Sequence, residues 1–201
     1  MEESNMKLKD IKLIHQGNYL SYYVLDYIDK DGNIKPYEMV SKQGSKLGRT
    51  DELTANSIGN IGTAVILLVL NEDNSKILLS KEFRMGVNHW VYNDVAGLIE
   101  PGETVGQAAA RELFEETGLK ITKIRNILPA TFTCAPVTDD VTTLVICNAE
   151  GNPIDCNQPY EQIKSAWYSK EEARELMRDK NNIFGGRLQA FIYMWINEGK
   201  L

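Results

Sequence analysis

The chain has 201 residues, of which 43% are hydrophobic and 25% are charged, and its formal net charge at pH 7 is −6. This composition is typical of a globular protein that can bury a sizeable core, and the acidic balance argues against nucleic acid as a partner. The aliphatic run TAVILLVL at residues 63–70 is far too short to cross a bilayer, so we expect no membrane partner.

The N-terminal residues 9–41 predict a small antiparallel β meander. Apolar and polar residues alternate in short runs, and the stretches Tyr19–Ile28 and Ile34–Val40 have the pattern of strands. Between them, Asp31-Gly32 is a hairpin turn signal. A meander of this size is not stable alone, so we expect this element, residues 1–45, to pack on the main domain or on a second subunit.

The main domain is expected over residues 60–201, preceded by a connecting loop over residues 42–62 that is rich in Gly, Ser, Asn and Thr. Strands are predicted at Thr63–Leu70, Lys76–Phe83, Ile121–Phe132, Val141–Asn148 and Ile163–Tyr168. Helices are predicted between Thr104 and Gly118, from a Ser169 cap to about Lys180, and from Arg187 to about Asn197, the last with core residues Leu188, Phe191, Ile192 and Trp195. Mixed strands with helices between them favour a layered α/β domain.

The stretch GLIEPGETVGQAAARELFEETGL at residues 97–119 places three glutamates on one side of a predicted helix. Glu112, Glu115 and Glu116 stand at positions i, i+3 and i+4, so they share a wedge about 100° wide. Like charges this close repel one another, and a site built only from oxygen ligands suits a hard divalent cation such as Mg²⁺. A solvated acidic face is the alternative interpretation of the three glutamates taken alone.

The flanks of the three glutamates carry the signals of a loop, a helix and a stop. Gly97 and Gly102 bracket a turn. Thr104 and Gln107 have the spacing of a capping box, and Gly118 suits the left-handed residue that ends a helix. This local organisation favours a built site over a solvated face.

Two further features of the same helix bear on a ligand. Val105, Ala108 and Ala109 lie near the glutamate face, and their small size is predicted to leave room for a ligand or a close backbone. Arg111 stands four residues before Glu115, where its guanidinium can hold that carboxylate in place.

The segment resembles the signature of the Nudix hydrolase family, G-x5-E-x7-R-E-U-x-E-E-x-G-U, in which U is a bulky aliphatic residue. Every fixed position is filled at the correct spacing, by Gly97, Glu103, Arg111, Glu112, Leu113, Glu115, Glu116, Gly118 and Leu119. The resemblance implies an α/β/α sandwich around a mixed β-sheet. It also implies Mg²⁺-dependent hydrolysis of a diphosphate linked to another moiety, with Mn²⁺ able to substitute for Mg²⁺.

The same resemblance implies roles for individual residues. Glu112 and Glu116 are the expected principal metal ligands, Glu115 is a third ligand or a water-activating residue, the carbonyl of Ala96 completes the metal shell, and Glu103 with Arg111 forms an orienting pair.

Three segments resemble those of ADP-ribose pyrophosphatases within this family. The triplet Glu82-Phe83-Arg84 matches one whose arginine contacts substrate, which makes Arg84 a candidate substrate-binding residue; a surface arginine at a strand end is the alternative. Pro136, 17 residues after Leu119, resembles a marker of ADP-ribose specificity. Glu161 stands where some of these enzymes carry the catalytic base; a solvated loop glutamate is the alternative.

The chain also departs from the family pattern before the signature. The family often has Glu-x-Pro-Ala-Gly there, whereas this chain has Asn93-Asp94-Val95-Ala96-Gly97. The missing proline and glutamate put the identity of the substrate in doubt and leave the metal helix untouched. We therefore expect hydrolysis of ADP-ribose or a related nucleoside diphosphate derivative to AMP and a sugar phosphate. Other nucleotide sugars, dinucleotides or nucleoside triphosphates are the alternative substrates, and a non-catalytic nucleotide sensor is the alternative of a different class.

The resemblance and the cysteines bear on assembly and location. ADP-ribose pyrophosphatases often carry an N-terminal β element like this one and use it in a swapped dimer, so a homodimer is expected. The N-terminus lacks the apolar segment of a signal peptide. Cys134, Cys147 and Cys156 are odd in number and lack metal-ligand spacing, so we expect buried or idle thiols in a reducing cytoplasm.

Overall fold

The computed structural model describes residues 5–42, 62–158 and 161–197. The chain divides into two compact units: unit 1 contains residues 1–63 and 130–142, and unit 2 contains residues 64–129 and 143–201. The loop predicted over residues 42–62 lies outside the described residues except at its two ends.

Unit 1 is built on a three-stranded antiparallel sheet, in the order β1 (Lys7–Gln16), β2 (Ser21–Ile28) and β3 (Ile34–Ser41). Its buried face carries the side chains of Tyr23, Leu25 and Met39. The turn between β2 and β3 contains Gly32 at φ +87°, a conformation that glycine adopts without strain. The predicted meander is therefore confirmed.

A second part of the chain joins unit 1. In residues 130–142, the short strand β9 (Thr131–Phe132) pairs with the start of β10 (Val141–Glu150). The backbone N–H of Val40 in β3 donates to the carbonyl of Val137 at 2.9 Å. The hydroxyl of Tyr37 donates to the carbonyl of Pro136 at 2.6 Å, which places this predicted marker residue in unit 1.

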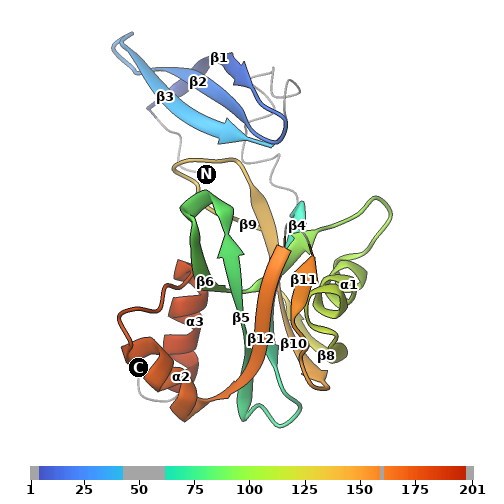
Figure 1. The fold of residues 1–201 in the computed structure, drawn as a ribbon. Coiled ribbons are helices and arrows are strands. Elements are labelled where there is room, and N and C mark those ends of the chain that lie inside the picture. Colours follow the sequence, from blue (N-terminus) through green and yellow to red (C-terminus); the bar gives the residue numbers. More distant parts are fainter. Residues whose placement is uncertain (1–4, 43–61, 159–160, 198–201) are drawn as a thin grey trace. The chain divides into compact units, whose positions relative to one another are not determined.

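Unit 2 contains most of a nine-stranded mixed sheet with the central order β11-β12-β5-β4-β10-β8 (Figure 1). The strands are β4 (Ala64–Leu70), β5 (Lys76–Arg84), β8 (Lys120–Ile127), β10, β11 (Cys156–Gln158) and β12 (Glu161–Ser169). Two further strands pair off this path: β6 (His89–Asn93) lies beside β5, and β7 (Val95–Leu98) lies beside β4. A single 3-10 turn, Met85–Val87, connects β5 to β6.

Helices cover both faces of this sheet. Side chains of β4 alternate between the two sides: Val65 and Val69 pack in one core with helix α1 (Val105–Thr117), and Leu68 packs in the other with α3 (Gly186–Ile196). Helix α2 (Lys170–Arg178) lies on the same side as α3 (Figure 1). The predicted α/β/α sandwich is therefore confirmed. Within the described residues, no helix is long and apolar enough to span a membrane.

Two predictions about local structure were wrong, and one pair of strands was missed. The strand predicted over Ile121–Phe132 is two strands, β8 and β9, separated by a segment containing Pro129, which has no N–H to donate to a ladder. The sequence interpretation also missed two short strands before the signature, β6 and β7. Gly97, predicted to bracket a turn with Gly102, pairs with Val65 inside β7, and the turn lies at Pro101-Gly102.

Of the two roles predicted for the small residues of α1, the structure shows the close backbone approach and not the room for a ligand. Val105, Ala108 and Ala109 are buried in the core against the sheet, with exposed fractions of 8%, 0% and 0%. They leave no space for a ligand. Their small size instead lets the helix backbone approach β4 and β7 closely, which brings its acidic residues near the sheet.

The cysteines differ in burial, and this predicts their reactivity. Cys147 and Cys156 are buried, Cys134 is exposed, and all three are free thiols. Burial raises the pKa of the Cys147 thiol to about 12, so it carries almost no thiolate near neutral pH. We expect a disulfide-exchange reagent to label only Cys134 quickly in the native protein and the buried pair only after unfolding. Fast labelling that persists in Cys134→Ser would contradict this expectation.

Candidate active site

The site begins where the chain passes from β6 to β7. Strand β6 pairs with β5 and β7 pairs with β4, so the chain moves from one central strand to its neighbour within the three residues 93–95. At the crossing, Asp94 is almost fully buried and accepts a hydrogen bond from Arg187 Nε at 3.1 Å. The corner of the sheet is thereby tied to α3, and the residues that follow it, Ala96 and Gly97, are presented toward α1.

Helix α1 is fixed in register by both of its ends. The Thr104 hydroxyl accepts from the Gln107 N–H at 3.3 Å, and the Gln107 side-chain oxygen accepts from the Thr104 N–H at 2.9 Å, which completes the predicted capping box. Gly118 ends the helix at φ 71°, with its N–H donated to the carbonyl of Phe114 at 2.8 Å. Both predicted ends are confirmed.

Arg111 joins the loop before the helix to the acidic face. Its Nε and Nη2 donate to the two oxygens of Glu103 at 2.8 and 2.9 Å, and Nη2 also donates to the carbonyl of Leu98 at 2.8 Å. Its Nη1 donates to Glu112 at 2.7 Å and to Glu115 at 3.2 Å. This bidentate, charge-assisted pairing lowers the pKa of Glu103 to about 2. The predicted contacts of Arg111 with Glu103 and Glu115 are therefore confirmed.

Replacing Arg111 by Ala should loosen this assembly without unfolding the protein. The variant loses the link between Glu103 and Glu112, so the carboxylates of the helix are no longer held in one arrangement. We expect hydrolytic turnover to fall by about tenfold to a hundredfold, because small displacements of reacting groups are costly. NMR titration of Glu103 should show its pKa returning to the ordinary carboxyl range. Arg178→Ala, on the exposed pair with Glu175, is the matched control and should retain full turnover.

Glu112 lies directly against the backbone of Gly97. A Cβ placed on Gly97 would come within 1.9–2.2 Å of the three carboxyl atoms of Glu112, which no real pair of atoms tolerates. Because Gly97 has no side chain, it leaves the space that the Glu112 carboxylate occupies. Burial raises the pKa of Glu112, an effect that the Arg111 guanidinium opposes.

Glu116 is the most deeply placed acid of the helix, with 6% of its surface exposed. Burial, then the charges of Glu161 and Glu82, raise its pKa to about 9, although the N–H of Ala96 donates a hydrogen bond to it. A carboxylate that is desolvated and faces other carboxylates is strongly disfavoured in its charged form unless a cation neutralises it.

The sheet supplies the partners of Glu116. Glu82 on β5 pairs in register with Ile163 on β12, and Glu161 stands two residues before Ile163, so both acids project from the same face of the sheet. Leu78, four residues before Glu82, packs in the core beneath α1, so this face is the one that α1 covers. Glu82 is therefore part of the acidic group, a role that the sequence interpretation missed; its period-two spacing from Leu78 was the available signal.

The remaining predicted residues lie at different places. Arg84 follows Glu82 at the end of β5, and its Nη2 lies 2.9 Å from a carboxylate oxygen of Glu82. The side chain of Glu115 is half exposed, unlike that of Glu116. Asn93, at the position of the glutamate that is missing from the family pattern, makes a side-chain hydrogen bond to Glu82.

The donor chemistry fits a hard divalent cation. In the described part of the chain, no three His, Cys, Asp or Glu side chains are already arranged around one point as metal ligands. The carboxylates of Glu112 and Glu116 nevertheless converge on the same strip of β7, and the burial of Glu116 among like charges disfavours its charged form unless a cation lies nearby. Carboxylate and backbone oxygens are the ligands that Mg²⁺ prefers. The residues present therefore fit such an ion.

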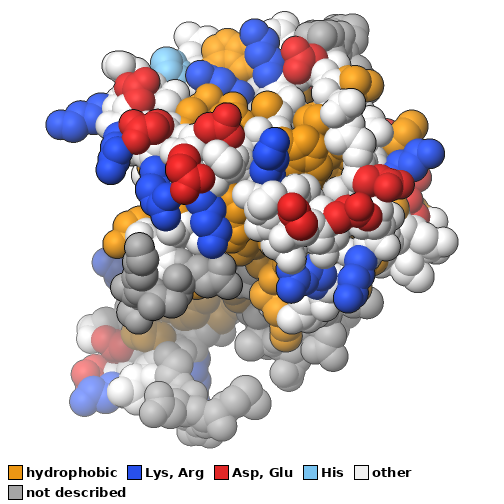
Figure 2. All heavy atoms as spheres, turned by 90° about the horizontal axis from the view of Figure 1, so that it is seen from below, with side chains coloured by type: hydrophobic (Ala, Val, Ile, Leu, Met, Phe, Trp, Pro, Cys, Tyr) orange, Lys and Arg blue, Asp and Glu red, His pale blue; other side chains and the backbone are white. Residues whose placement is uncertain are grey.

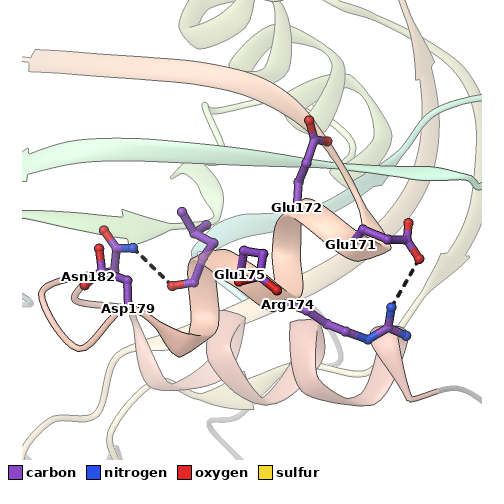
Figure 3. Close-up of a pocket in the computed structure, with 7 residues that line it drawn as sticks. Glu171, Glu172, Arg174, Glu175, Asp179 and Asn182 are labelled. Carbon is purple, nitrogen blue, oxygen red and sulfur yellow. Dashed lines mark hydrogen bonds and ion pairs between the residues drawn. The ribbon is translucent and has the colours of Figure 1, made fainter.

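Of two hollows among the described residues of unit 2, the one beside β6 adjoins the acidic group. The hollow beside α2, of about 550 Å³, is lined mainly by charged and polar residues, and Figure 3 shows the ion pair between Glu171 and Arg174 among them. The second hollow, of about 620 Å³, lies beside β6 and is lined by residues that include Arg84 and Asn93. Because both residues contact Glu82, this second hollow continues directly from the acidic group.

The family model of the NUDIX domain matches residues 61–187, more than half of the chain. The chain belongs to the Nudix family. The match includes the acidic helix, the strands that face it and the first two residues of α3, so the whole acidic group lies inside the matched region.

Curated Nudix relatives match over part of their length. Nudix hydrolase 19, chloroplastic, of Arabidopsis thaliana is 29% identical over 118 residues, which are 58% of this chain and 26% of that protein. NAD-capped RNA hydrolase NUDT12 of Homo sapiens is 26% identical over 136 residues, 67% of this chain and 27% of that protein. The matched region thus spans about a quarter of the length of these relatives.

A solved structure shares the fold over nearly the whole chain. The crystal structure of an ADP compounds hydrolase superposes with a TM-score of 0.71 and covers 98% of this chain and 95% of its own, at 16% sequence identity. The likeness at this identity establishes the common Nudix architecture, including the N-terminal β element.

Proposed function

We propose that this Nudix protein is a Mg²⁺-dependent hydrolase that cleaves the diphosphate of ADP-ribose or a related nucleoside diphosphate derivative to AMP and a sugar phosphate. The observation that carries the proposal is Glu116, buried on the signature helix among Glu112, Glu82 and Glu161. Such buried carboxylates suit a substrate with phosphate groups, because one divalent cation can bind both the carboxylate oxygens and the phosphate oxygens.

Different residues are assigned different roles in the proposed reaction. Water adds to one phosphorus atom, the P–O bond of the diphosphate bridge breaks, and the proton of the water passes to a carboxylate, for which Glu161 or Glu115 is the proposed acceptor. Glu112 and Glu116, with the carbonyl of Ala96, would hold the ion, which when bound supplies positive charge to the leaving phosphate. Arg111 and Glu103 orient these groups and take no part in bond making.

Arg84 is the proposed contact to the substrate from the sheet side. Its guanidinium lies at the boundary between the acidic group and the β6 hollow, where a diphosphate bound near Glu116 would extend. Pro136 is proposed as a substrate contact from the family resemblance alone.

A substrate panel tests the proposal. Purified protein with Mg²⁺ is incubated with ADP-ribose, a nucleotide sugar, a dinucleotide and a nucleoside triphosphate, and the products are resolved by chromatography. We expect AMP and ribose phosphate from ADP-ribose, at a rate that chelation of the metal abolishes and that Mn²⁺ restores. Turnover of ADP-ribose no faster than that of unrelated nucleotides would refute the assignment of substrate.

A dinucleotide is the second candidate substrate. It is supported by the relatives whose names describe hydrolysis of NAD-capped RNA, since that cap is an NAD group. A role for RNA itself has less support, because the net charge is −6 and the described Lys and Arg side chains on the face in Figure 2 are interspersed with Asp and Glu. A non-catalytic sensor is disfavoured because every acid of the signature is present.

We also propose that unit 1 contributes to a homodimer in the cytoplasm. Unit 1 exposes large apolar side chains at Leu13 and Ile14 of β1 and at Leu20 in the turn that follows, which a second copy would cover. Sedimentation equilibrium of the full chain should give a dimer mass, and Ile14→Asp should shift that mass toward the monomer. A monomer in the unaltered chain would refute the proposal.

A further inference from the structure

The Glu82 carboxylate is held by a second side chain on each side of it. Glu82 lies within the sheet, paired in register with Val91 on β6 and with Ile163 on β12. One of its carboxylate oxygens lies 2.9 Å from Nη2 of Arg84, and the side chain of Asn93 hydrogen-bonds to the carboxylate. Only 15% of the Glu82 side chain is exposed, against 45% for Arg84. The carboxylate is therefore fixed in place, whereas its arginine partner keeps surface that a ligand can reach.

Asn93 is oriented by the segment that precedes α3. A Cβ placed on Gly185 would lie 2.6 Å from Oδ1 of Asn93, so the amide oxygen occupies the space that this glycine leaves. The N–H of Gly185 donates to the carbonyl of Tyr92 at 2.8 Å, which holds the segment against β6. The amide nitrogen of Asn93 is then available to donate to the Glu82 carboxylate. Asn93, Glu82 and Arg84 thus form a chain of contacts that begins at a fixed stretch of backbone.

Several carboxylates attract the Arg84 guanidinium. Glu82 is its direct partner, and Glu161 and Glu116 lie close enough to Glu82 to interact with it by charge. Asp94 is also within range of Arg84, but it already pairs with a guanidinium of α3 at 3.1 Å. A pair between Arg84 and Glu116 would occupy a carboxylate that the proposed ion needs. The pair with Glu82 instead keeps the guanidinium at the edge of the acidic group.

Arg84 can contact a ligand while it stays paired with Glu82. The β6 hollow, of about 620 Å³, is lined by both Arg84 and Asn93. A guanidinium carries several N–H donors in a rigid planar fork, and the contact to Glu82 is made through Nη2. The other donors can bind phosphate oxygens without loss of the ion pair. The pair therefore fixes the direction in which Arg84 presents these donors.

We propose that Glu82 is a positioning residue that holds the Arg84 guanidinium toward the substrate diphosphate and away from the metal-binding carboxylates, and that Asn93 holds Glu82 in this place. The inference rests on the proposed function, because that function places a diphosphate beside Arg84. Glu82 acts only through Arg84 and contacts neither the ion nor the substrate. One negative charge is needed between residues 82 and 93, and a second one there would repel the first.

Exchange of the charge between residues 82 and 93 provides the test. Glu82→Gln removes the charge that holds Arg84 and keeps the length of the side chain. Asn93→Asp adds a second carboxylate beside Glu82. The double variant Glu82→Gln/Asn93→Asp returns one negative charge to the two residues, with the amide now at residue 82 and the carboxylate at residue 93. Glu171→Gln, whose exposed carboxylate pairs with Arg174 on α2, is the matched control.

Steady-state kinetics with ADP-ribose and Mg²⁺ separates a positioning role from metal binding. We expect both single variants to raise KM by about tenfold with kcat changed by less than about threefold, because Arg84 binds substrate and transition state alike. The double variant should return KM to within about threefold of the unaltered value, and Glu171→Gln should change neither constant. A fall in kcat with a rise in the Mg²⁺ concentration needed for half the maximal rate would make Glu82 a metal ligand and overturn the proposal.

A double-mutant cycle shows whether Glu82 acts through Arg84. Arg84→Ala should raise KM by at least as much as Glu82→Gln does. Adding Glu82→Gln to Arg84→Ala should cause no further rise, because the side chain that Glu82 holds is already gone. Additive effects of the two substitutions on KM would overturn the proposal.

The NMR signals of the Arg84 guanidinium keep this proposal distinct from the hydrolytic function. In EDTA and without substrate, a guanidinium held by a carboxylate rotates slowly and gives separate Nη–H signals, whereas a released one gives averaged signals. We expect separate signals in the unaltered chain, averaged signals in Glu82→Gln and separate signals again in the double variant. If this pattern occurs without hydrolysis of any nucleotide in Mg²⁺, the proposed function fails and the hold of Glu82 on Arg84 stands. If ADP-ribose is hydrolysed but Glu82→Gln leaves the Arg84 signals unchanged, the positioning role fails.

Discussion

Glu116→Gln is expected to lower turnover by about two to three orders of magnitude while the fold is retained. The amide keeps the shape of the side chain and an oxygen that can accept from the N–H of Ala96, but it removes the negative charge that would hold the ion. The measurement is hydrolysis at saturating Mg²⁺, together with calorimetric titration of Mg²⁺ or Mn²⁺. Unchanged turnover would remove Glu116 from the metal site.

The same substitution should stabilise the metal-free protein, and it should also change how the free energy of unfolding depends on pH. The pKa of Glu116 is about 9 in the folded chain, against 4.5 for an unperturbed glutamate. Between these values the folded state binds more protons than the unfolded state, so the free energy of unfolding falls as the pH rises, by up to about 1.4 kcal/mol per pH unit. Glu116→Gln removes this dependence on pH. Denaturant unfolding in EDTA at pH 5 and pH 8 measures the difference in the free energy of unfolding for the unaltered chain and the variant.

Glu175→Gln on α2 is the matched control for both measurements. Its carboxylate is exposed and pairs with the equally exposed Arg178, so its removal should change neither turnover nor the slope of stability with pH. A slope that survives in Glu116→Gln would show that another group carries the protonation.

The acidic helix could be predicted in detail because its signals are local. The cap at Thr104, the left-handed Gly118 and the one-sided spacing of the glutamates all act within a few residues of one another. The ion pairs of Arg111 are equally local on the helix, and its bond to Glu103 spans only eight residues. The N-terminal meander followed from the same kind of short-range pattern.

The parts that sequence could not predict depend on pairing between distant strands. The segment 89–98 contains two short strands, which pair with β5 and β4. These pairings depend on the arrangement of the whole sheet and are not encoded within the segment itself. Glu82 joins the acidic group only because β5 lies beside β12, which brings Glu161 onto the same face. The buried pair of Asp94 with Arg187 joins residues 93 positions apart, and neither one signals the other in the sequence.

The departure from the family pattern has a structural counterpart. At the position of the family's glutamate, this chain has Asn93, whose side chain hydrogen-bonds to Glu82. At the next position, where the family pattern allows any residue, Asp94 is buried and pairs with Arg187. The other carboxylate oxygen of Asp94 has no described hydrogen-bond partner. A buried pair of this kind is weak evidence of stabilisation. Its position at the β6–β7 crossing argues instead that it sets where Ala96 and Gly97 stand relative to α1.

Gly97→Ala should separate activity from folding more sharply than any other change in the signature. The new methyl group would overlap the Glu112 carboxyl, which is the far end of a flexible side chain and can move aside. The fold therefore survives, but the carboxylate leaves the place in which Arg111 holds it. We expect turnover to fall by about a hundredfold, the cost of a displacement of about 1 Å at a reacting group. The midpoint of thermal unfolding in EDTA should change little.

Gly106→Ala is the matched control, because it makes the same substitution in the first turn of the same helix. Its Cβ would meet only the end of the Ile124 side chain, at 3.1 Å, and alanine favours the helix over glycine by about 1 kcal/mol. This variant should keep full turnover and be at least as stable as the unaltered chain. If both variants lost activity equally, the loss would reflect the helix backbone and not the position of Glu112. If Gly97→Ala retained full activity, Glu112 would not need its place against β7, and its assignment as a metal ligand would fail.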